Sequence, residues 1–231
     1  MKKAIVMMFT VACFSLIALN AMAYPVEIIS SNSHVWGNYS LEYTNGNNEW
    51  MPPMQDSYDN MGNAPQSGGV NIYYDGTNLH AFSKANLFDV SVDALARGSW
   101  SYESSAGAHA QSDTTFRPLD NFNTLDFTYK ATEVWSLFNG SLIDVTDNVV
   151  IWNLSLNGSD AWFGGVDTIN YAFQSDHLYS MHLYAYANAN ADATDATFGF
   201  KDLQAVPESA TMLLLGLGLM GLAGIRRKIK K

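Results

Sequence analysis

The chain has 231 residues, of which 48% are hydrophobic and 15% are charged, and its formal net charge is −10 at pH 7. This composition excludes disordered, collagen-like and polytopic membrane proteins. Seven of the twelve Lys and Arg residues lie at the two ends, which leaves five against 21 acidic residues between Tyr24 and Ala205. Such an acidic middle argues against nucleic acid as a partner, because phosphate binding needs a basic surface.

The first 23 residues have the pattern of a secretory signal peptide. A basic start is followed by the almost wholly apolar residues 4–19, and Ala21 and Ala23 stand at the two positions that a signal peptidase reads. We therefore expect cleavage after Ala23 and a mature chain that begins at Tyr24. A lipoprotein signal that uses Cys13 is the alternative, but the residues before it lack the expected leucine. Because Cys13 is the only cysteine, the mature chain can form no disulfide.

Residues 44–69 are rich in Asn, Gly, Pro and Met and show no apolar alternation. Loops of this length are uncommon inside compact domains and are usually functional or disordered. The segment is predicted to be a surface loop that packs over one end of the domain, with Trp50 and Tyr58 among its apolar residues.

In the rest of the middle, apolar and polar residues alternate with a period of two, which is typical of half-buried strands. Residues 70–74 and 79–83 flank an Asp-Gly pair and predict a tight hairpin. Apolar residues then alternate with polar ones over 88–93, 125–132 and 150–156. Residues 178–193 continue the pattern with alanine at every second position, which predicts an edge strand or one with a thin core, and 197–203 is predicted to be the closing strand.

About eight to twelve strands in one domain, residues 24–205, indicate an all-β fold. We expect an antiparallel β-sandwich of the jelly-roll-like kind, without helices longer than a turn or two. An extracellular solenoid is the structural alternative, but no fixed repeat period supports it.

Known catalytic and metal-binding patterns are absent from the middle. It has no cysteine nucleophile, no Gly-x-Ser-x-Gly elbow and no Glu-x-Asp-x-x-Glu spacing. No His-x-His or Asp-x-Asp-x-Asp-Gly spacing occurs, and the turn pairs Asp144 with Asp147 and Asp192 with Asp195 are interpreted as solvated carboxylates. We therefore predict no catalytic residue, no metal site and no cofactor.

Aromatic residues in loop-like segments are the candidate ligand-binding residues. Aromatic rings near Asp, Asn and Glu side chains can bind the faces of sugars. The candidates are Trp50, Tyr58, Trp162 and Phe163.

The last 26 residues form a tail of three parts. Val206, Pro207, Glu208 and Ser209 precede the apolar residues 210–225, and Arg226, Arg227 and Lys228 follow them. As a transmembrane helix, residues 210–225 would span about 24 Å, and the flanking basic side chains can extend to the membrane surface. The basic end is expected to stay in the cytoplasm, which places residues 24–205 on the exported side. A permanent single-pass anchor is one interpretation.

The tail also resembles the PEP-CTERM sorting signal of Gram-negative bacteria, with Ser209 where that family usually has a second proline. The resemblance implies recognition by an exosortase, a membrane enzyme that would cut near Pro207 and Glu208. Signal peptidase, an exosortase-like enzyme and, transiently, the inner membrane are then the expected partners.

The predicted function is that of an exported, non-enzymatic protein of the cell surface or extracellular matrix, such as a biofilm, with a structural or adhesive role. Extracellular polysaccharide is a further candidate partner. A carbohydrate- or calcium-binding module is the alternative, and a glycan-active hydrolase on the same sandwich is a third possibility.

Overall fold

The computed structural model describes residues 24–43, 51–74, 77–97, 103–131, 136–157, 163–190 and 193–205. These residues form thirteen strands. Within the described part of the chain, no helix is long and apolar enough to cross a membrane. The signal segment, residues 1–23, and the sorting tail, residues 206–231, lie outside the described residues.

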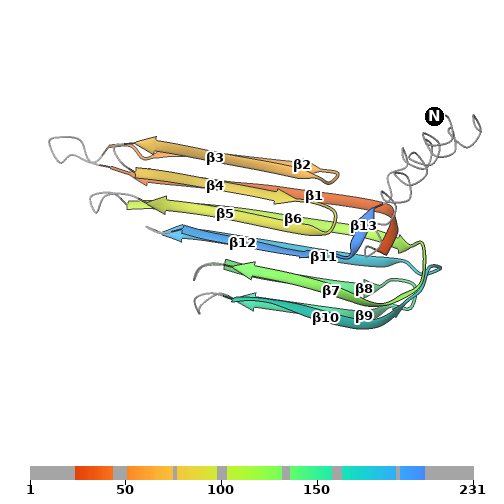
Figure 1. The fold of residues 1–231 in the computed structure, drawn as a ribbon. Coiled ribbons are helices and arrows are strands. Elements are labelled where there is room, and N and C mark those ends of the chain that lie inside the picture. Colours follow the sequence, from red (N-terminus) through yellow and green to blue (C-terminus); the bar gives the residue numbers. More distant parts are fainter. Residues whose placement is uncertain are drawn as a thin grey trace, which may run out of the picture.

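The strands form two sheets that lie face to face as the layers of a sandwich (Figure 1). In the first sheet, the order is β13 (Leu203–Ala205), β1 (Tyr24–Glu42), β6 (Glu103–Pro118), β11 (Tyr179–Asn190), β8 (Ser136–Asp144) and β9 (Val149–Asn157), and β2 (Met54–Gly62) also pairs with β1. In the second sheet, the order is β10 (Phe163–Phe173), β7 (Phe122–Ala131), β12 (Ala193–Phe200), β5 (Asp89–Arg97), β4 (Thr77–Ala85) and β3 (Gln66–Tyr74).

The predicted all-β sandwich is confirmed, and its strand pairs are antiparallel with one exception. The short strand β13 runs parallel to the start of β1, with Tyr24 opposite Leu203 and Val26 opposite Ala205. The predicted hairpin is also confirmed, since β3 and β4 pair from Tyr74 and Thr77 outward around the Asp-Gly pair.

Alternating burial builds the core, and the size of the buried side chains changes along the strands. On β11, Tyr179 and Met181 are fully buried at one end, whereas Ala187 and Ala189 are fully buried at the other. On the antiparallel neighbour β6, the buried residues run from Ala106 to Phe116 in the opposite chain direction. Large rings therefore collect at one end of the sandwich, where Phe88 in the turn before β5 contacts Phe116 on β6, with ring centroids 5.8 Å apart.

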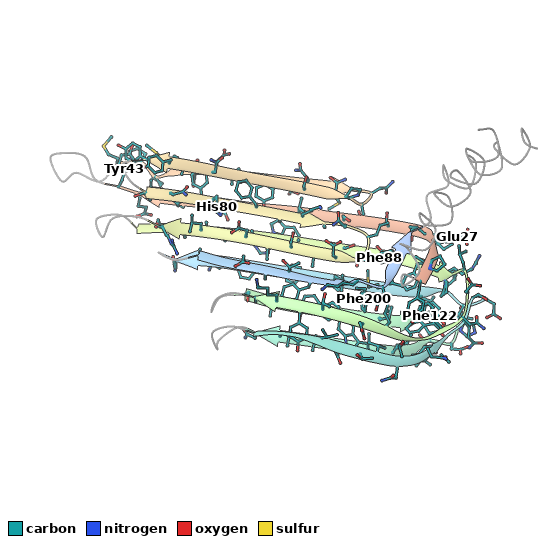
Figure 2. All side chains as sticks on the ribbon, viewed as in Figure 1. Glu27, Tyr43, His80, Phe88, Phe122 and Phe200 are labelled. Carbon is teal, nitrogen blue, oxygen red and sulfur yellow. The ribbon has the colours of Figure 1, made fainter. Side chains whose placement is uncertain are left out.

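The view with side chains shows the same gradient from end to end (Figure 2). Phe88, Phe122 and Phe200 lie toward the end where β13 pairs with β1, and Tyr43 lies at the opposite end. Small residues at the far end allow the two sheets to pack with little volume between them.

The predicted long loop at 44–69 is wrong for the described residues from 51 onward, because two strands occupy most of it. β2 pairs with β1 over nine residue positions, and β3 begins at Gln66 in the other sheet. Every residue of β2 is exposed or half-buried, so main-chain hydrogen bonds to β1 hold this edge strand, and Met54 and Tyr58 alone pack partly against the core. A strand of this kind leaves no apolar alternation in the sequence.

Residues 178–193 were predicted to form an edge strand or a strand with a thin core. The first of these alternatives is wrong, because the alanine-rich strand is not at an edge. β11 lies between β6 and β8 in the first sheet. Its thin core is confirmed, because Ala185 and Ala187 face Ala110 and Ala108 of β6 and all four are fully buried. The small side chains reflect close packing of the two sheets rather than an exposed position.

Candidate functional site

The strand register gathers five aromatic side chains on the outer face of the first sheet. Trp36 on β1 lies opposite His109 on β6, and His109 lies opposite Tyr186 on β11. These positions point outward because their neighbours along each strand, such as Val35, are buried in the core. The five rings are called the aromatic ridge below: His34, Trp36, His109, Tyr184 and Tyr186.

The rings of the ridge stack on one another across three strands. The ring centroids of Trp36 and His109 are 4.6 Å apart with planes 11° from parallel, and those of His109 and Tyr186 are 4.4 Å apart. His34 lies 4.2 Å from Trp36, and the Nδ1 atom of His109 is 2.9 Å from the hydroxyl of Tyr184. In this stack, which runs from Trp36 through His109 to Tyr186, the rings turn their edges to the solvent. The faces of the outermost rings are directed along the sheet, away from the stack.

Short polar side chains lie beside the ridge on β8 and β9. Asn139 is opposite Tyr184 and Ser155, and Ser141 is opposite His182 and Asn153. The Ser155 hydroxyl donates to the Asn139 Oδ1 atom at 2.8 Å. We call Asn139, Ser141, Asn153 and Ser155 the polar floor, since they cover the sheet next to the flank of the ridge.

The ridge is electrically neutral at its centre. Burial, and secondarily the nearby His34, lowers the pKa of His109 to about 4, and burial raises the pKa of Tyr184 and of Tyr186. At neutral pH, His109 is therefore an uncharged imidazole and the two tyrosines keep their phenol protons. An uncharged aromatic wall next to amide and hydroxyl groups is suited to a sugar, whose ring has apolar C–H faces and a rim of hydroxyl groups.

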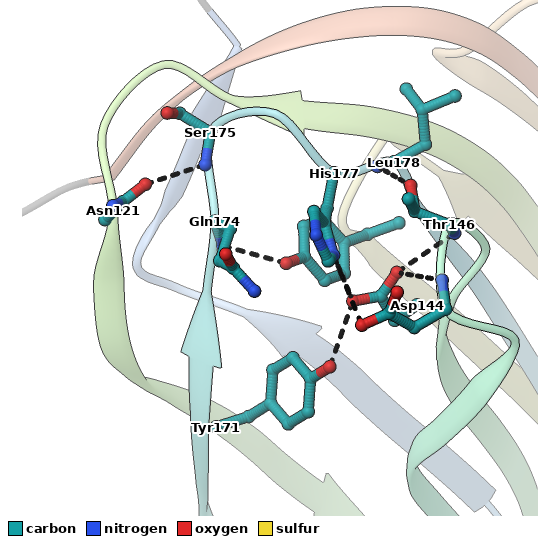
Figure 3. Close-up of polar contacts among 10 residues, drawn as sticks. Asn121, Asp144, Thr146, Tyr171, Gln174, Ser175, His177 and Leu178 are labelled. Atoms are coloured by element: carbon teal, nitrogen blue, oxygen red, sulfur yellow. Dashed lines mark hydrogen bonds and ion pairs between the residues drawn. The ribbon is translucent and has the colours of Figure 1, made fainter.

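A second polar cluster lies in the turn between β8 and β9 (Figure 3). Asp144 is fully buried, and its Oδ1 atom accepts hydrogen bonds from the backbone N–H groups of Thr146 and Asp147 at 3.0 and 3.1 Å. Its Oδ2 atom accepts from the Tyr171 hydroxyl at 2.9 Å and lies 2.8 Å from the Nδ1 atom of His177. The solvated carboxylate predicted at this position is wrong, because Asp144 joins the turn to β10 and to the segment before β11.

The cluster also contains Asp147 and therefore has the residue types of a metal site. One ligand atom from each of Asp144, Asp147 and His177 lies within 4.8 Å of the others. However, each oxygen of Asp144 already has two hydrogen-bond partners, which uses the acceptor positions of a carboxylate. Burial raises the pKa of Asp144, but the bonds from His177, Asp147 and Tyr171 outweigh it and hold that pKa below its ordinary value. The donor set fits an anchored turn better than a calcium site.

Of the four residues predicted for ligand binding, Tyr58 is the one whose side chain the structure describes. Tyr58 lies on β2, its ring lies against Gly37 and Gly68, and its hydroxyl is 2.6 Å from the Ser83 hydroxyl. Burial raises the pKa of Tyr58 to about 12, so this side chain has a packing role, and its part in ligand binding stays a prediction. Phe163 begins β10, and its backbone pairs with Ala131.

The other predicted site residues lie outside the described residues. They are Trp50, Trp162, the signal-cleavage residues Ala21 and Ala23, the motif Val206, Pro207, Glu208 and Ser209, and the basic residues Arg226, Arg227 and Lys228.

The aromatic ridge was missed by sequence reasoning, although a local signal for it exists. Trp36, Tyr184 and Tyr186 occupy the outward positions of strands whose inward positions are filled by residues such as Val35 and Ala185. Large rings at the positions where alternation predicts polar side chains are the signal. Only the tertiary pairing shows that these rings lie next to one another.

The outer face of the second sheet carries a pair of carboxylates. Asp195 on β12 lies opposite Asp93 on β5, and both line a shallow hollow of about 290 Å³. Burial and the neighbouring Asp93 raise the pKa of Asp195, and the Nε2 atom of His80 lies 3.1 Å from the Asp93 Oδ1 atom. A pair of carboxyl groups is the minimum that a glycan-cleaving site requires.

Another groove, of about 580 Å³, lies at the aromatic end of the sandwich. Its lining is mainly apolar and comes from the turn before β5 and the end of β12, including Leu87, Phe88, Phe198 and Phe200. The carboxylate of Asp89 at its rim accepts two hydrogen bonds from the amide nitrogen of Asn86.

Comparison with known proteins identifies the tail. A family model described as the PEP-CTERM protein-sorting motif matches residues 205–228, so the chain carries this motif. None of the curated proteins matches the chain significantly.

Several solved structures of carbohydrate-binding modules are similar to the described sandwich. One is a CBM4 structure, with 10% identity, 55% of this chain and 79% of the other covered, and a TM-score of 0.29. A family 11 module from Clostridium thermocellum, in complex with a β-1,3-1,4-mixed-linked tetrasaccharide, has 11% identity, coverages of 77% and 98%, and a TM-score of 0.25. The C-terminal CBM6 of LamC from Zobellia galactanivorans has 12% identity, coverages of 58% and 99%, and a TM-score of 0.24. At these values, the likeness says nothing about what this chain binds.

Proposed function

We propose, from the premise that this chain carries a PEP-CTERM protein-sorting motif, that it is an exported protein processed by an exosortase-like enzyme. The signal segment directs export, and the tail holds the precursor in the membrane until it is cut. The domain of residues 24–205 is then displayed at the cell surface or in the extracellular matrix. There it has an adhesive role, because it binds extracellular polysaccharide without cleaving it.

The placement of the chain ends supports this proposal. β13 ends at Ala205, directly before the sorting motif, and pairs with β1 at Tyr24, the expected first residue of the mature chain. Both membrane-directed segments therefore leave the domain from the same end. Trp36 lies twelve residues further along β1, which corresponds to about 40 Å of extended strand, so the aromatic ridge is held away from the anchored end.

The observation that carries polysaccharide binding is the aromatic ridge next to the polar floor. The face of Tyr186 or Tyr184 can contact one side of a sugar ring, while Asn139, Ser141 and Asn153 can hydrogen-bond its hydroxyl groups. An open sheet face also leaves room for a chain of sugars to continue in both directions. The strand order, with β11 and β12 inserted in the middle of the two sheets, supports the jelly-roll-like interpretation of the sandwich.

The test is a glycan-array screen of the exported protein, purified as the cell processes it, with and without calcium. Tyr186→Ala and Trp36→Ala are expected to weaken binding at least about fivefold, because a stacked ring contributes about 1 kcal/mol or more to a contact. Phe82→Ala is the matched control, since Phe82 is an exposed ring on the outer face of the second sheet. It is expected to leave binding unchanged.

Loss of binding in Phe82→Ala to the same extent as in Tyr186→Ala would contradict the site. Absence of binding to every glycan on the array would contradict the function and favour a structural matrix protein. Trp50→Ala and Trp162→Ala belong in the same screen, because the loop aromatics remain predicted ligand contacts.

A glycan-active hydrolase is the second candidate function, and the Asp93 and Asp195 pair favours it. If these carboxyl groups act as acid and nucleophile, the wild-type protein releases reducing sugar from bacterial polysaccharide, and both Asp93→Asn and Asp195→Asn abolish the release. Release that survives both substitutions would contradict this assignment.

A further inference from the structure

The charged groups next to the aromatic ridge are mainly carboxylates. Asp59 on β2 lies opposite Trp36, with 75% of its side chain exposed, and its Oδ1 atom is 2.7 Å from His34 Nε2. Asp113 on β6 lies opposite His182, with 41% of its side chain exposed, and its two oxygens contact His182 Nδ1 at 2.6 Å and Gln111 Nε2 at 2.7 Å. One carboxylate therefore lies beside Trp36 at the β2 edge of the ridge, and the second lies on β6, four residues, or about 13 Å of strand, further along than His109.

The permanently charged cations of the domain lie elsewhere. Of the five Lys and Arg residues between Tyr24 and Ala205, four belong to the second sheet or the segment after it: Lys84 on β4, Arg97 on β5, Lys130 on β7 and Lys201 after β12. The fifth, Arg117, is on β6 but pairs with Glu27 at 3.2 Å. Eight residues, or about 26 Å of strand, separate it from His109.

His109 adds no positive charge at the centre of the ridge, since burial lowers its pKa to about 4. At the ridge, a polyanionic glycan, such as a chain of uronic acids, would meet carboxylates, because Arg117, the arginine on the outward side of β6, is distant from the rings and is paired with Glu27. Its binding would be opposed by like charge. A protonated amino group on a sugar bound at the rings would instead be attracted by Asp59 and Asp113, and ring faces also attract cations.

We infer that the aromatic ridge selects glycans that contain hexosamines with free amino groups over neutral glycans, and rejects uronic-acid glycans. The inference rests on the proposed polysaccharide binding and adds the ligand class. In this arrangement, the rings and the polar floor hold the sugar backbone. Asp59 and Asp113 provide the preference for the amine.

The experiment compares short β-1,4-linked oligomers that share one backbone and differ in charge: glucosamine, N-acetylglucosamine and glucose. An oligomer of uronic acid is the anionic probe. Affinities of the exported protein are measured by calorimetry at a pH where the amine is protonated. The glucosamine oligomer is expected to bind about tenfold more tightly than the other two, and the difference is expected to shrink with added salt, because partly exposed charges are screened.

Asp59→Asn and Asp113→Asn are each expected to reduce the preference for glucosamine about threefold and to leave binding of the glucose oligomer unchanged. Asp120→Asn is the matched control. It removes the same charge from an exposed position in the turn after β6 and is expected to keep the full preference. This control separates recognition at the ridge from the general attraction between an acidic domain and a cation.

Equal affinity for the glucosamine and glucose oligomers would overturn the inference and leave polysaccharide binding intact. Tight binding of the uronic-acid oligomer, or an equal effect of Asp120→Asn, would overturn it as well. Binding of none of the four oligomers, together with silence on the glycan array, would count against the proposed function itself.

Discussion

Asp144 is a carboxylate in a surface turn that nevertheless belongs to the core. Four hydrogen bonds compensate its burial, and they tie the turn after β8 to Tyr171 on β10 and to His177. The residue after this turn, Asn148, has a φ of 56°, a left-handed conformation that asparagine tolerates. The turn is therefore specified by its own residues and by two residues that follow more than 20 positions later.

Replacement of Asp144 by alanine is expected to lower the free energy of unfolding by about 3 kcal/mol, since it leaves buried donors without an acceptor. Urea unfolding of the wild type and the variant measures the difference. Asp120→Ala, in an exposed turn, is the matched control and is expected to change stability by less than about 0.5 kcal/mol. Equal effects of the two substitutions would contradict the anchoring role.

The contact between His177 and Asp144 predicts a specific pH dependence. The hydrogen bond to Asp144 raises the pKa of His177 above its ordinary value of 6.5, so the folded state binds this proton more tightly than the unfolded chain does. The resulting stability is fully present below pH 6.5 and is lost as the pH rises through the raised pKa. His177→Gln should therefore lower the melting temperature most in acid and least at alkaline pH. A difference that grows with pH would contradict the assignment.

For His109, the dependence of stability on pH has the opposite sign. Its pKa is lowered to about 4 by burial and by His34, so the unfolded chain takes up a proton before the folded protein does. Stability is therefore lost as the pH falls from about 6.5 to about 4. In His109→Phe, which keeps a ring in the stack, the urea midpoint should fall less over this interval than in the wild type. Parallel pH curves for the two proteins would be the contrary result.

At the scale of elements, the alanine-rich halves of β6 and β11 determine how closely the sheets approach. Ala187 of β11 faces Ala108 of β6, and both are fully buried. Because no space is left for larger side chains, greater hydrophobicity at these positions does not mean greater stability.

Ala187→Leu is expected to lower the free energy of unfolding by about 1–3 kcal/mol through overpacking. Ser180→Leu is the matched control, since Ser180 lies on the outward side of the same strand. A denaturant titration that shows Ala187→Leu to be as stable as the control would contradict close packing at this end.

At the scale of the whole molecule, the two ends of the described domain lie together, and the aromatic ridge lies away from them. The parallel pair of β13 and β1 brings Ala205, where the sorting motif begins, opposite Val26, two residues after the expected start of the mature chain. The ridge lies further along the same sheet, and the remaining cations lie mainly on the other sheet. This arrangement agrees with a precursor that is held at its ends while its binding face is exposed.

The sorting motif predicts that the surface-exposed protein lacks both ends of the chain. Intact-mass measurement should give a species without residues 1–23 and without the basic residues after position 225. Pro207→Ala with Glu208→Gln is expected to leave most of the protein as uncut precursor in the membrane fraction. Ser209→Pro, which restores the usual second proline of the family, is expected to be processed at least as well as the wild type. Surface-exposed protein that keeps Arg226 to Lys231 would contradict the prediction.

Sequence alone determined the features that depend on neighbouring residues. Alternation over two positions predicted the strands around Val90, Phe127 and Trp152, and the Asp-Gly pair predicted the hairpin of β3 and β4. The sorting tail was also identifiable, because its three parts are contiguous and its order carries the signal. β2 was missed because an exposed edge strand is held by backbone hydrogen bonds, which any sequence can supply.

Tertiary structure decided what depends on residues far apart in the chain. His109 and Tyr184 are 75 positions apart, and nothing near either residue specifies the register that brings the two rings together. The same is true of Asp144 and His177, which are 33 positions apart, and of β11, which is central only because β6 and β8 pair on both sides of it. Alternation states which face of a strand a residue occupies, but only strand order and register determine its neighbours on that face.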